Sequence, residues 1–209
     1  MTWTEVLILL KSSTKFEQIN EKREEIAGWI PAIRIMFDYD QNSNYHQYDL
    51  WMHSVYTVLE IPKEIDDDML YLAALLHDIG KPNCRCEGHK EGDIWSHYYG
   101  HPDVSEKIVS EQVIPHLFAM GEHLLFDDMR RLLYYIKYHD DRISLRLKHL
   151  RRHLKLVDID TFKKLMLLEV ADAKAHVMYP KIKERIEICS EWVNGRADEL
   201  KQQLDGKES

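Results

Sequence analysis

The segment from residue 69 to residue 79 constrains the fold more than any other part of the chain, because nearly all of its side chains are apolar. A helix that is apolar all the way round must be buried, whereas a surface helix keeps one polar face. Three aspartates at 66–68 precede the segment, where acidic side chains complement the helix dipole and cap free amides. Gly80 and Pro82 end it. The sequence therefore predicts a buried helix at the centre of the fold.

Helical periodicity dominates the rest of the chain as well. We expect further helices over Phe16–Ile30, Tyr48–Ile61, Pro102–Ile114, Asp127–Tyr138, Leu145–Leu156, Asp160–His176 and Pro180–Leu204. Residues 81–101 lack this period, and their short alternating patches predict a small irregular hairpin or loop. Loops of that length in compact domains are usually functional or disordered. The fold class we expect is all-α, a helical bundle with one such hairpin.

Length, charge and cysteine content exclude several classes of protein. A chain of 209 residues suits one domain with helical extensions. Its apolar runs fall well short of the roughly 20 residues that cross a bilayer, so no membrane span is expected. Three cysteines and an N-terminus without a signal-peptide pattern favour the reducing cytoplasm. A formal net charge of −8 argues against strong nucleic-acid binding. The sequence leaves the oligomeric state open.

Four side chains of metal-binding type lie among apolar neighbours in three of the predicted helices. His53 lies in the middle of one helix, His77 and Asp78 lie at the end of the central helix, and Asp172 lies in a third. A charged carboxylate is costly to bury without a partner, and a divalent cation is an effective partner. Helical bundles commonly project ligands inward onto such an ion. These residues therefore predict a buried metal site.

The order of these residues, with Leu-Leu-His-Asp-Ile-Gly-Lys at 75–81, resembles that of the HD-domain metal-dependent phosphohydrolases. The stretches 45–54 and 97–101 resemble the HD domain attached to bacterial tRNA nucleotidyltransferases, whose nucleotidyltransferase head has no counterpart here. The resemblance predicts an HD domain over residues 45–179. An N-terminal helical extension over 1–44 would precede this domain, and a C-terminal helix within 180–209 would pack on it.

The resemblance implies one divalent metal ion bound by His53, His77, Asp78 and Asp172. His101 and His139 match positions where dinuclear members bind a second ion that Asp78 bridges, although mononuclear members also occur. Imidazole and carboxylate ligands suit Mn, Fe, Co, Ni or Zn, and Mg is a further candidate. We expect one ion, and a second is an open alternative.

The same resemblance implies catalysis by a water molecule that the metal activates. The catalytic residues would then be Asp78, Lys81 and Asp140. Lys81 follows the central helix directly, where the family commonly has a lysine, and is expected to bind the substrate phosphate. Asp140 could transfer a proton or orient His139, because metal-bound histidines usually donate their other N–H to an acceptor.

Three further groups of polar residues carry weaker signals. Arg142 and Arg146 could bind the substrate phosphate, although the basic run over 142–155 is more often explained as a solvated helix face. The pattern Cys84-x-Cys86-x-x-His89 lacks a second ligand pair at the spacing of a zinc site, so we expect a hairpin with free thiols. The remaining histidines are expected at the surface or beside the ligands: His46, His116, His123, His149, His153 and His176.

The function we expect is metal-dependent hydrolysis of a small nucleotide-like phosphomonoester or phosphodiester. The first candidates are 2′- or 3′-nucleotides and 2′,3′-cyclic phosphates. Two alternatives stay open. An HD-type di-iron oxygenase would need His101 and His139 as ligands, and a non-catalytic nucleotide-binding or partner-binding module would keep the site for structure. Lys81 and the intact ligand set argue against the non-catalytic module.

Overall fold

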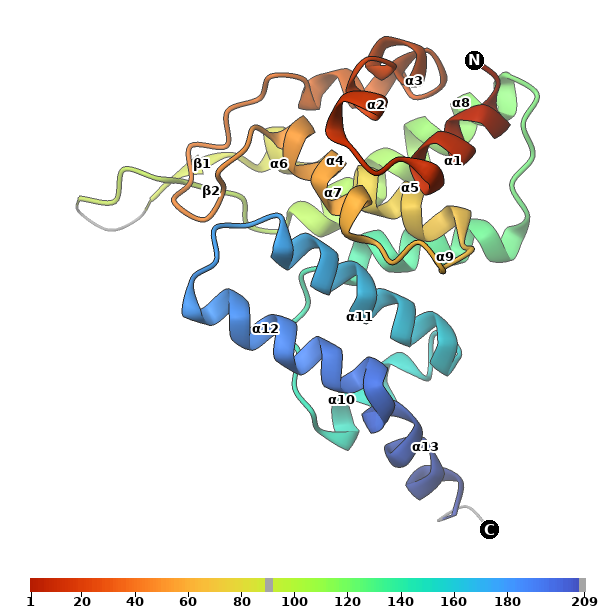
Figure 1. Cartoon of the computed structure of the whole chain (residues 1–209), viewed down its shortest axis with the longest axis vertical. Coiled ribbons are helices and arrows are strands. Elements are labelled where there is room, and N and C mark those ends of the chain that lie inside the picture. The colour runs from red at the N-terminus through yellow and green to blue at the C-terminus, as the bar shows by residue number, and fades with distance from the viewer. Residues whose placement is uncertain (89–91, 207–209) are drawn as a thin grey trace.

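The helix α5 (Asp68–Leu76) lies at the centre of the structure, a computed structural model that describes residues 1–88 and 92–206 (Figure 1). Every residue from Met69 to Leu76 is buried, as the apolar pattern predicts. The helix ends at Leu76, earlier than predicted, and residues 77–80 form a turn. His77 and Asp78 lie on this turn, so the end of the central helix positions both of them.

Helices from distant parts of the chain pack against α5. They are α1 (Trp3–Ser12), α4 (Leu50–Glu60), α9 (Phe126–Tyr138) and α11 (Ile159–Lys174). Asp49 caps α4 by accepting a hydrogen bond of 2.8 Å from the amide of Met52. Asp158 caps α11 in the same way, with 2.7 Å to the amide of Thr161. The buried faces of these helices join in one apolar core.

The N-terminal segment forms α2 (Phe16–Asn20), α3 (Arg23–Trp29) and the 3₁₀ helix η1 (Pro31–Met36). The single helix predicted over Phe16–Ile30 is therefore wrong, because the chain leaves the helix at residues 21–22. Asn20 lies at this break, and its Oδ1 accepts a hydrogen bond of 2.9 Å from Nε1 of Trp51. Asparagine favours turns and caps over helix interiors, which accounts for the position of the break.

A short helix, α6 (Lys81–Cys84), and a hairpin follow the central turn. The hairpin pairs β1 (Cys86–Glu87) with β2 (Ser96–His97) in antiparallel register, with Cys86 opposite His97. It projects from one end of the helical body (Figure 1). The small hairpin predicted within residues 81–101 is thus confirmed.

The rest of the chain is mostly helical: α7 (His101–Ile108), the π-helical turn η2 (Val109–Val113), α8 (Ile114–Ala119), α10 (Leu147–His153), α12 (Pro180–Glu191), the kinked turn η3 (Trp192–Arg196) and α13 (Ala197–Asp205). The turn η2 ends two residues before Pro115, which has no N–H to continue the α-helical pattern. Gly195 has a φ of +127°, which favours glycine. The predicted helix over Pro180–Leu204 is therefore interrupted between α12 and α13.

The described residues confirm the all-α class, since helices make up their regular structure apart from the two-residue strands. None of the described helices is long and apolar enough to cross a membrane. The division into residues 1–44, 45–179 and 180–209 stays a prediction. In the structure, α1 contacts α5 and α12 contacts α11, so both outer segments pack onto the central helices.

Asp67 is a buried carboxylate that ties α5 to two other helices. Its Oδ1 caps the first amides of α5, and its side chain is 0 % exposed. Its Oδ2 accepts hydrogen bonds from Lys164 at 2.7 Å, Arg131 at 3.1 Å and Tyr135 at 3.3 Å. Removal of one member of such a network leaves the others incompletely paired. Asp67 therefore contributes to stability through several bonds at once.

We expect Asp67→Asn to lower the free energy of unfolding by about 2–3 kcal/mol, because hydrogen bonds to charged groups each contribute about 1.5–3 kcal/mol. The measurement is urea denaturation followed by circular dichroism. The control is Asp66→Asn, whose side chain is 90 % exposed and which should leave the transition unchanged. Equal stability of the two variants would contradict the role given to Asp67.

Candidate metal centre

The structure brings the four predicted ligands of the first ion together at one buried point. His53 comes from the middle of α4, His77 and Asp78 come from the turn after α5, and Asp172 comes from the last part of α11. Both histidines are fully buried, and Asp78 and Asp172 are 2 % and 8 % exposed. Because α4 and α11 both pack against α5, three segments that are distant in sequence meet here.

The ligand atoms of this group face one another. His53 Nε2 lies 2.9 Å from Asp172 Oδ1 and 3.4 Å from Asp78 Oδ2. His77 Nε2 lies 3.2 Å from Asp78 Oδ2 and 3.4 Å from Asp172 Oδ1. All four ligand atoms lie within 4.8 Å of one another. Two imidazole nitrogens and two carboxylate oxygens at this spacing could hold one divalent ion of the first transition row or Zn.

A second group lies on the other side of Asp78. His101 is the first residue of α7, and His139 follows the last residue of α9. Their Nε2 atoms lie 3.0 Å and 3.5 Å from Asp78 Oδ1, and 3.2 Å from each other. Asp78 thus presents Oδ2 to one pair of histidines and Oδ1 to another. A carboxylate in this position could bridge two ions.

Backbone carbonyls orient three of the four histidine rings. The Nδ1 atoms of His77, His101 and His139 donate to the carbonyl oxygens of Ala74, Tyr98 and Ile136 at 2.9, 2.9 and 2.7 Å. These bonds place the proton on Nδ1 and leave Nε2 free as a metal ligand, as is usual for metal-binding histidines. The prediction that Asp140 orients His139 is therefore wrong, because the carbonyl of Ile136 occupies that position.

The hydrogen bonding of the first group fits a cation. In the first group, His53 Nε2, His77 Nε2 and Asp172 Oδ1 are buried and have no hydrogen-bond partner among the described residues, and the same holds for Asp78 Oδ1, which faces the second group. Buried polar atoms in proteins are nearly always paired, and three such atoms at one point indicate a ligand that satisfies them together. The donor set, imidazole and carboxylate, matches a divalent metal ion.

The ammonium group of Lys81 faces the carboxylate of Asp78. Lys81 is 5 % exposed, and its Nζ lies 2.6 Å from Asp78 Oδ2. The same ammonium donates to Gln41 Oε1 at 3.0 Å and to His46 Nε2 at 3.2 Å. Burial by itself would raise the pKa of the Asp78 carboxyl, but Lys81 and then His77 hold this pKa well below its usual range. Asp78 is therefore ionised, as a metal ligand must be.

His77 and Asp172 show the same balance between burial and charge. Burial opposes protonation of His77, but Asp78 and Asp172 outweigh it and raise the pKa of His77 to about 10. Burial would raise the pKa of Asp172, and His176 and His53 hold it well below its usual range. The two carboxylates thus create a strongly negative point that attracts either protons or a metal ion.

His46 and His176 lie directly beside the ligands. The sequence left open whether these two histidines lie at the surface or beside the ligands. The ring centroids of His46 and His176 lie 4.8 Å and 4.9 Å from that of His53, and 4.3 Å from each other. His176 lies just after the end of α11, four residues beyond Asp172, and its Nδ1 is 2.8 Å from the carbonyl oxygen of Asp172. In the helix predicted over Asp160–His176 this spacing places both residues on one face, so it was a usable signal. His46 precedes α4 on a loop, and the sequence near it carries no comparable periodic signal.

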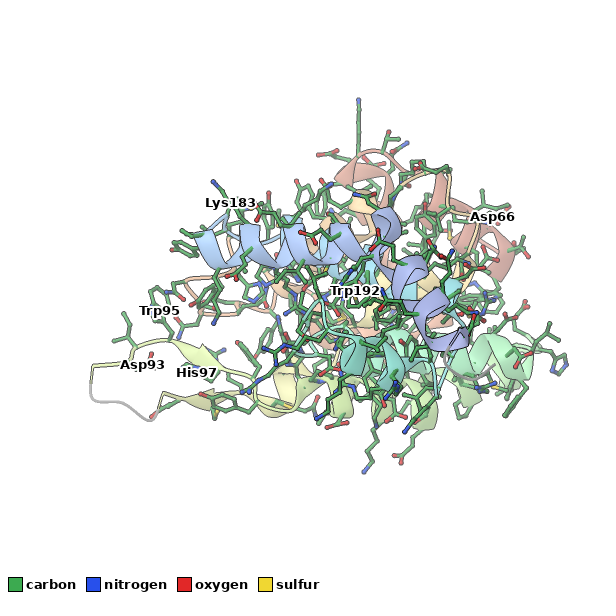
Figure 2. All side chains as sticks on the ribbon, turned by 90° about the horizontal axis from the view of Figure 1, so that it is seen from below. Asp66, Asp93, Trp95, His97, Lys183 and Trp192 are labelled. Carbon is green, nitrogen blue, oxygen red and sulfur yellow. The ribbon has the colours of Figure 1, made fainter. Side chains whose placement is uncertain are left out.

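A cavity of about 490 Å³ opens onto both groups of ligands. Its lining includes Asp78, Lys81, His101, His139, Asp140 and Asp172, together with Trp95, Tyr98 and Tyr99 of the hairpin region. Figure 2 shows Asp93, Trp95 and His97 on the hairpin at one end of the molecule. The volume is in the range of pockets that enclose small ligands such as nucleotides.

Arg185 on α12 connects the end of α9 to α11. Its Nη2 donates to the carbonyl oxygen of His139 at 2.8 Å and pairs with Glu169 Oε2 at 3.0 Å. Its Nη1 lies 3.4 Å from Asp140 Oδ1. Burial raises the pKa of Glu169 to about 8, and Arg185 acts in the opposite direction. Arg185 and Glu169 are functional candidates that the sequence alone did not indicate.

The remaining predicted residues lie away from the ligand groups. Arg142 and Arg146 are exposed and line a different cavity from the one described above. Cys84 and Cys86 have free thiols, as expected, and belong to none of the described groups that could hold a metal ion. His89 lies outside the described residues. His97 pairs with Asp93, with 2.8 Å between Nε2 and Oδ2.

We expect the wild-type protein to bind two divalent ions per chain, measured by mass spectrometry of the metal after dialysis against Mn²⁺ or Zn²⁺. His139→Ala should keep one ion, because the group around His53 is intact. The matched control is Asp103→Ala, an acidic side chain that is 74 % exposed and should not change the metal content. One ion in both the wild type and His139→Ala would exclude the second group as a metal site.

We expect Arg185→Ala to lower the free energy of unfolding by about 3 kcal/mol, because it removes the contacts of the guanidinium with the His139 carbonyl and the buried Glu169, and hydrogen bonds to charged groups contribute about 1.5–3 kcal/mol each. The measurement is again urea denaturation. Arg196→Ala removes a surface pair with Glu199 and should change stability little. Equal effects of the two substitutions would show that Arg185 does not act as a buried partner.

Comparison with known proteins agrees with this geometry. The family model of the HD domain matches residues 45–182, which is more than half of the chain. No curated protein matches the chain. The specific resemblance to the HD domain of tRNA nucleotidyltransferases stays a prediction. The matched range contains His53, the His77-Asp78 pair and Asp172 in the order already described, and the chain belongs to the HD domain family.

Proposed function

We propose that this HD-domain protein hydrolyses a small nucleotide-like phosphomonoester or phosphodiester, with 2′- or 3′-nucleotides and 2′,3′-cyclic phosphates as the first candidates. The observation that carries the proposal is the position of Asp78. Its two oxygens face two groups of histidines, and it lines a cavity of nucleotide size. Divalent ions held there would lower the pKa of water and take up charge on phosphoryl oxygens.

The protein itself supplies the charges that hold the site and its substrate. Lys81 keeps Asp78 ionised and fixed, and it also lines the cavity, where its ammonium could share a phosphate oxygen. Asp140 is exposed in the same cavity, close to Arg185, so its carboxylate could accept or return a proton at the rim. These roles of Lys81 and Asp140 are part of the proposal.

The hairpin supports a substrate with an aromatic base. Trp95 is 39 % exposed and Tyr99 is 65 % exposed, and both line the cavity above the ligands. The Tyr99 ring stacks on that of His97, with centroids 5.4 Å apart and an interplanar angle of 7°. Exposed aromatic rings beside a phosphate site are suited to stack on a base. A nucleotide could thus place its phosphate at Asp78 and its base against the hairpin.

An HD-type di-iron oxygenase is the second candidate, and one observation favours it. His101 and His139 complete the ligand set that a dinuclear iron centre needs, with Asp78 between the two groups. Iron content and oxygen consumption distinguish the two functions. Phosphate release with Mn²⁺ or Co²⁺ and without oxygen consumption supports the hydrolase, and iron-dependent oxygen uptake supports the oxygenase.

We expect the wild type to hydrolyse at least one member of a panel of 2′-, 3′- and 5′-nucleotides and 2′,3′-cyclic nucleotides. Asp78→Ala should lower kcat at least about 100-fold, because mutation of residues that only support the metal ligands already lowers metal affinity or activity about 10–100-fold. Products are followed by phosphate release and chromatography.

Two controls make this measurement decisive. Asp103→Ala removes an exposed carboxylate of the same charge and should keep wild-type activity. Circular dichroism of Asp78→Ala should show an intact helical fold. An Asp78→Ala variant with full activity, or a wild type inactive on the whole panel with every metal tested, contradicts the proposed function.

A further inference from the structure

A second cavity, of about 560 Å³, lies over α10 and the loop before it. Its cationic lining residues are Arg142, Arg146, Lys148, Arg151, Arg152 and Lys155. Figure 1 shows α10 at the end of the molecule that carries α13, away from the hairpin that borders the metal centre. None of these six residues lines the metal-centre cavity as the structure describes it. We name the second hollow the basic cavity.

The charge of the basic cavity is largely uncompensated. The chain has no Asp or Glu between residues 142 and 155, although the whole protein has a formal net charge of −8. Arg152 forms an ion pair with Asp141. Within the ranges 1–88 and 92–206, no ion pair is formed by the side chains of the other five cations. Like charges brought together repel one another, so this arrangement is destabilising unless an anion binds between them.

A buried histidine at the base of the cavity lacks a partner. His149 lines the cavity but is only 7 % exposed, and its Nε2 has no hydrogen-bond partner in the described part of the chain. Its ring packs against His153, Phe162 and Trp192, with centroids 4.7, 5.9 and 5.9 Å away. An unpaired buried polar atom costs free energy. His149 thus adds a polar ring to the cationic lining of the basic cavity.

We propose that the basic cavity binds a small anion that carries two or more phosphate groups. Six cations exceed what a single phosphate needs, and the volume fits a ligand of nucleotide size. The net negative charge of the chain disfavours a long nucleic acid, because affinity for one comes largely from many Lys and Arg contacts with phosphates. This site is separate from the metal centre, and the proposal does not rest on the function proposed for that centre.

The test is calorimetric titration of the full metal-loaded chain with methylenediphosphonate, a probe with two phosphonate groups and no hydrolysable bond. The same metal concentration is present in cell and syringe. We expect the double variant Arg146→Gln, Arg151→Gln to bind the probe at least about tenfold more weakly than the wild type, because both lost side chains are charged partners of the anion. Higher salt should weaken binding to the wild type.

Two controls locate the binding. Lys107→Gln, Lys183→Gln removes two exposed charges elsewhere and should bind like the wild type; Figure 2 shows Lys183 on the outside of α12. Asp172→Ala perturbs the metal centre. In this background the probe should still bind to the basic cavity, and the Arg146→Gln, Arg151→Gln substitutions should still weaken that binding. His149→Leu should also weaken binding, with thermal unfolding as the check on folding.

Three results would overturn the proposal. The first is equal affinity of the wild type and the Arg146, Arg151 double variant. The second is binding that disappears in Asp172→Ala, which would assign the probe to the metal centre. The third is a single-stranded RNA oligonucleotide that binds more tightly than the probe and is weakened by the same double variant, which would assign the cavity to nucleic acid.

Discussion

The carboxylate of Asp78 is the group on which the candidate site depends. It is 2 % exposed, its two oxygens face separate histidine groups, and Lys81 lies 2.6 Å from one of them. A buried charge of this kind needs compensation, which comes from Lys81, the surrounding imidazoles and any bound cation. Asp78 lies on the turn that ends α5, and α5 is packed on every side. The most apolar helix thus supports the most highly charged point, and a change in core packing would move the ligands.

Local patterns in the sequence were sufficient for the central features. The all-apolar segment predicted the buried helix α5, and the caps at Asp49 and Asp158 account for where α4 and α11 begin. The positions of His53, His77-Asp78 and Asp172 in these helices follow from the same patterns, because each lies among residues that must face the core. Their convergence follows once α4 and α11 are packed against α5.

Features that depend on tertiary contacts could not be predicted in this way. The break after Asn20 coincides with a side-chain bond to Trp51, which lies 31 residues further along the chain. Asp140 contacts Arg185, which lies 45 residues further along the chain, so its surroundings also depend on a tertiary contact. His46 reaches the metal centre from a loop, so no helical period places it. His176 is different, because its spacing of four from Asp172 is visible in the sequence.

The C-terminal helix α12 contributes to the site through Arg185, which pairs with Glu169 of α11 and with Asp140. An apolar pair of equal volume could join α12 to α11 with similar stability, since desolvation offsets much of the attraction between buried charges. Arg185 differs from such a pair because it also donates to the carbonyl of His139 at 2.8 Å. The guanidinium therefore fixes the end of α9, where His139 leaves the helix. Through this contact, the N-terminal half of α12 helps to hold His139 in its position in the second histidine group.

The two cavities should attract phosphates for different reasons. In the metal-centre cavity, Asp78 and Asp172 outnumber Lys81, so the protein charges alone oppose a phosphate until divalent cations reverse the local field. In the basic cavity, the arginines and lysines attract phosphate directly, without a metal ion. Chelation of metal should therefore abolish anion binding at the first cavity and leave the second unaffected. Salt should act most strongly on the second, because its charges are exposed to solvent and screened by it. Metal and ionic strength are thus independent controls over the two cavities of one small helical protein.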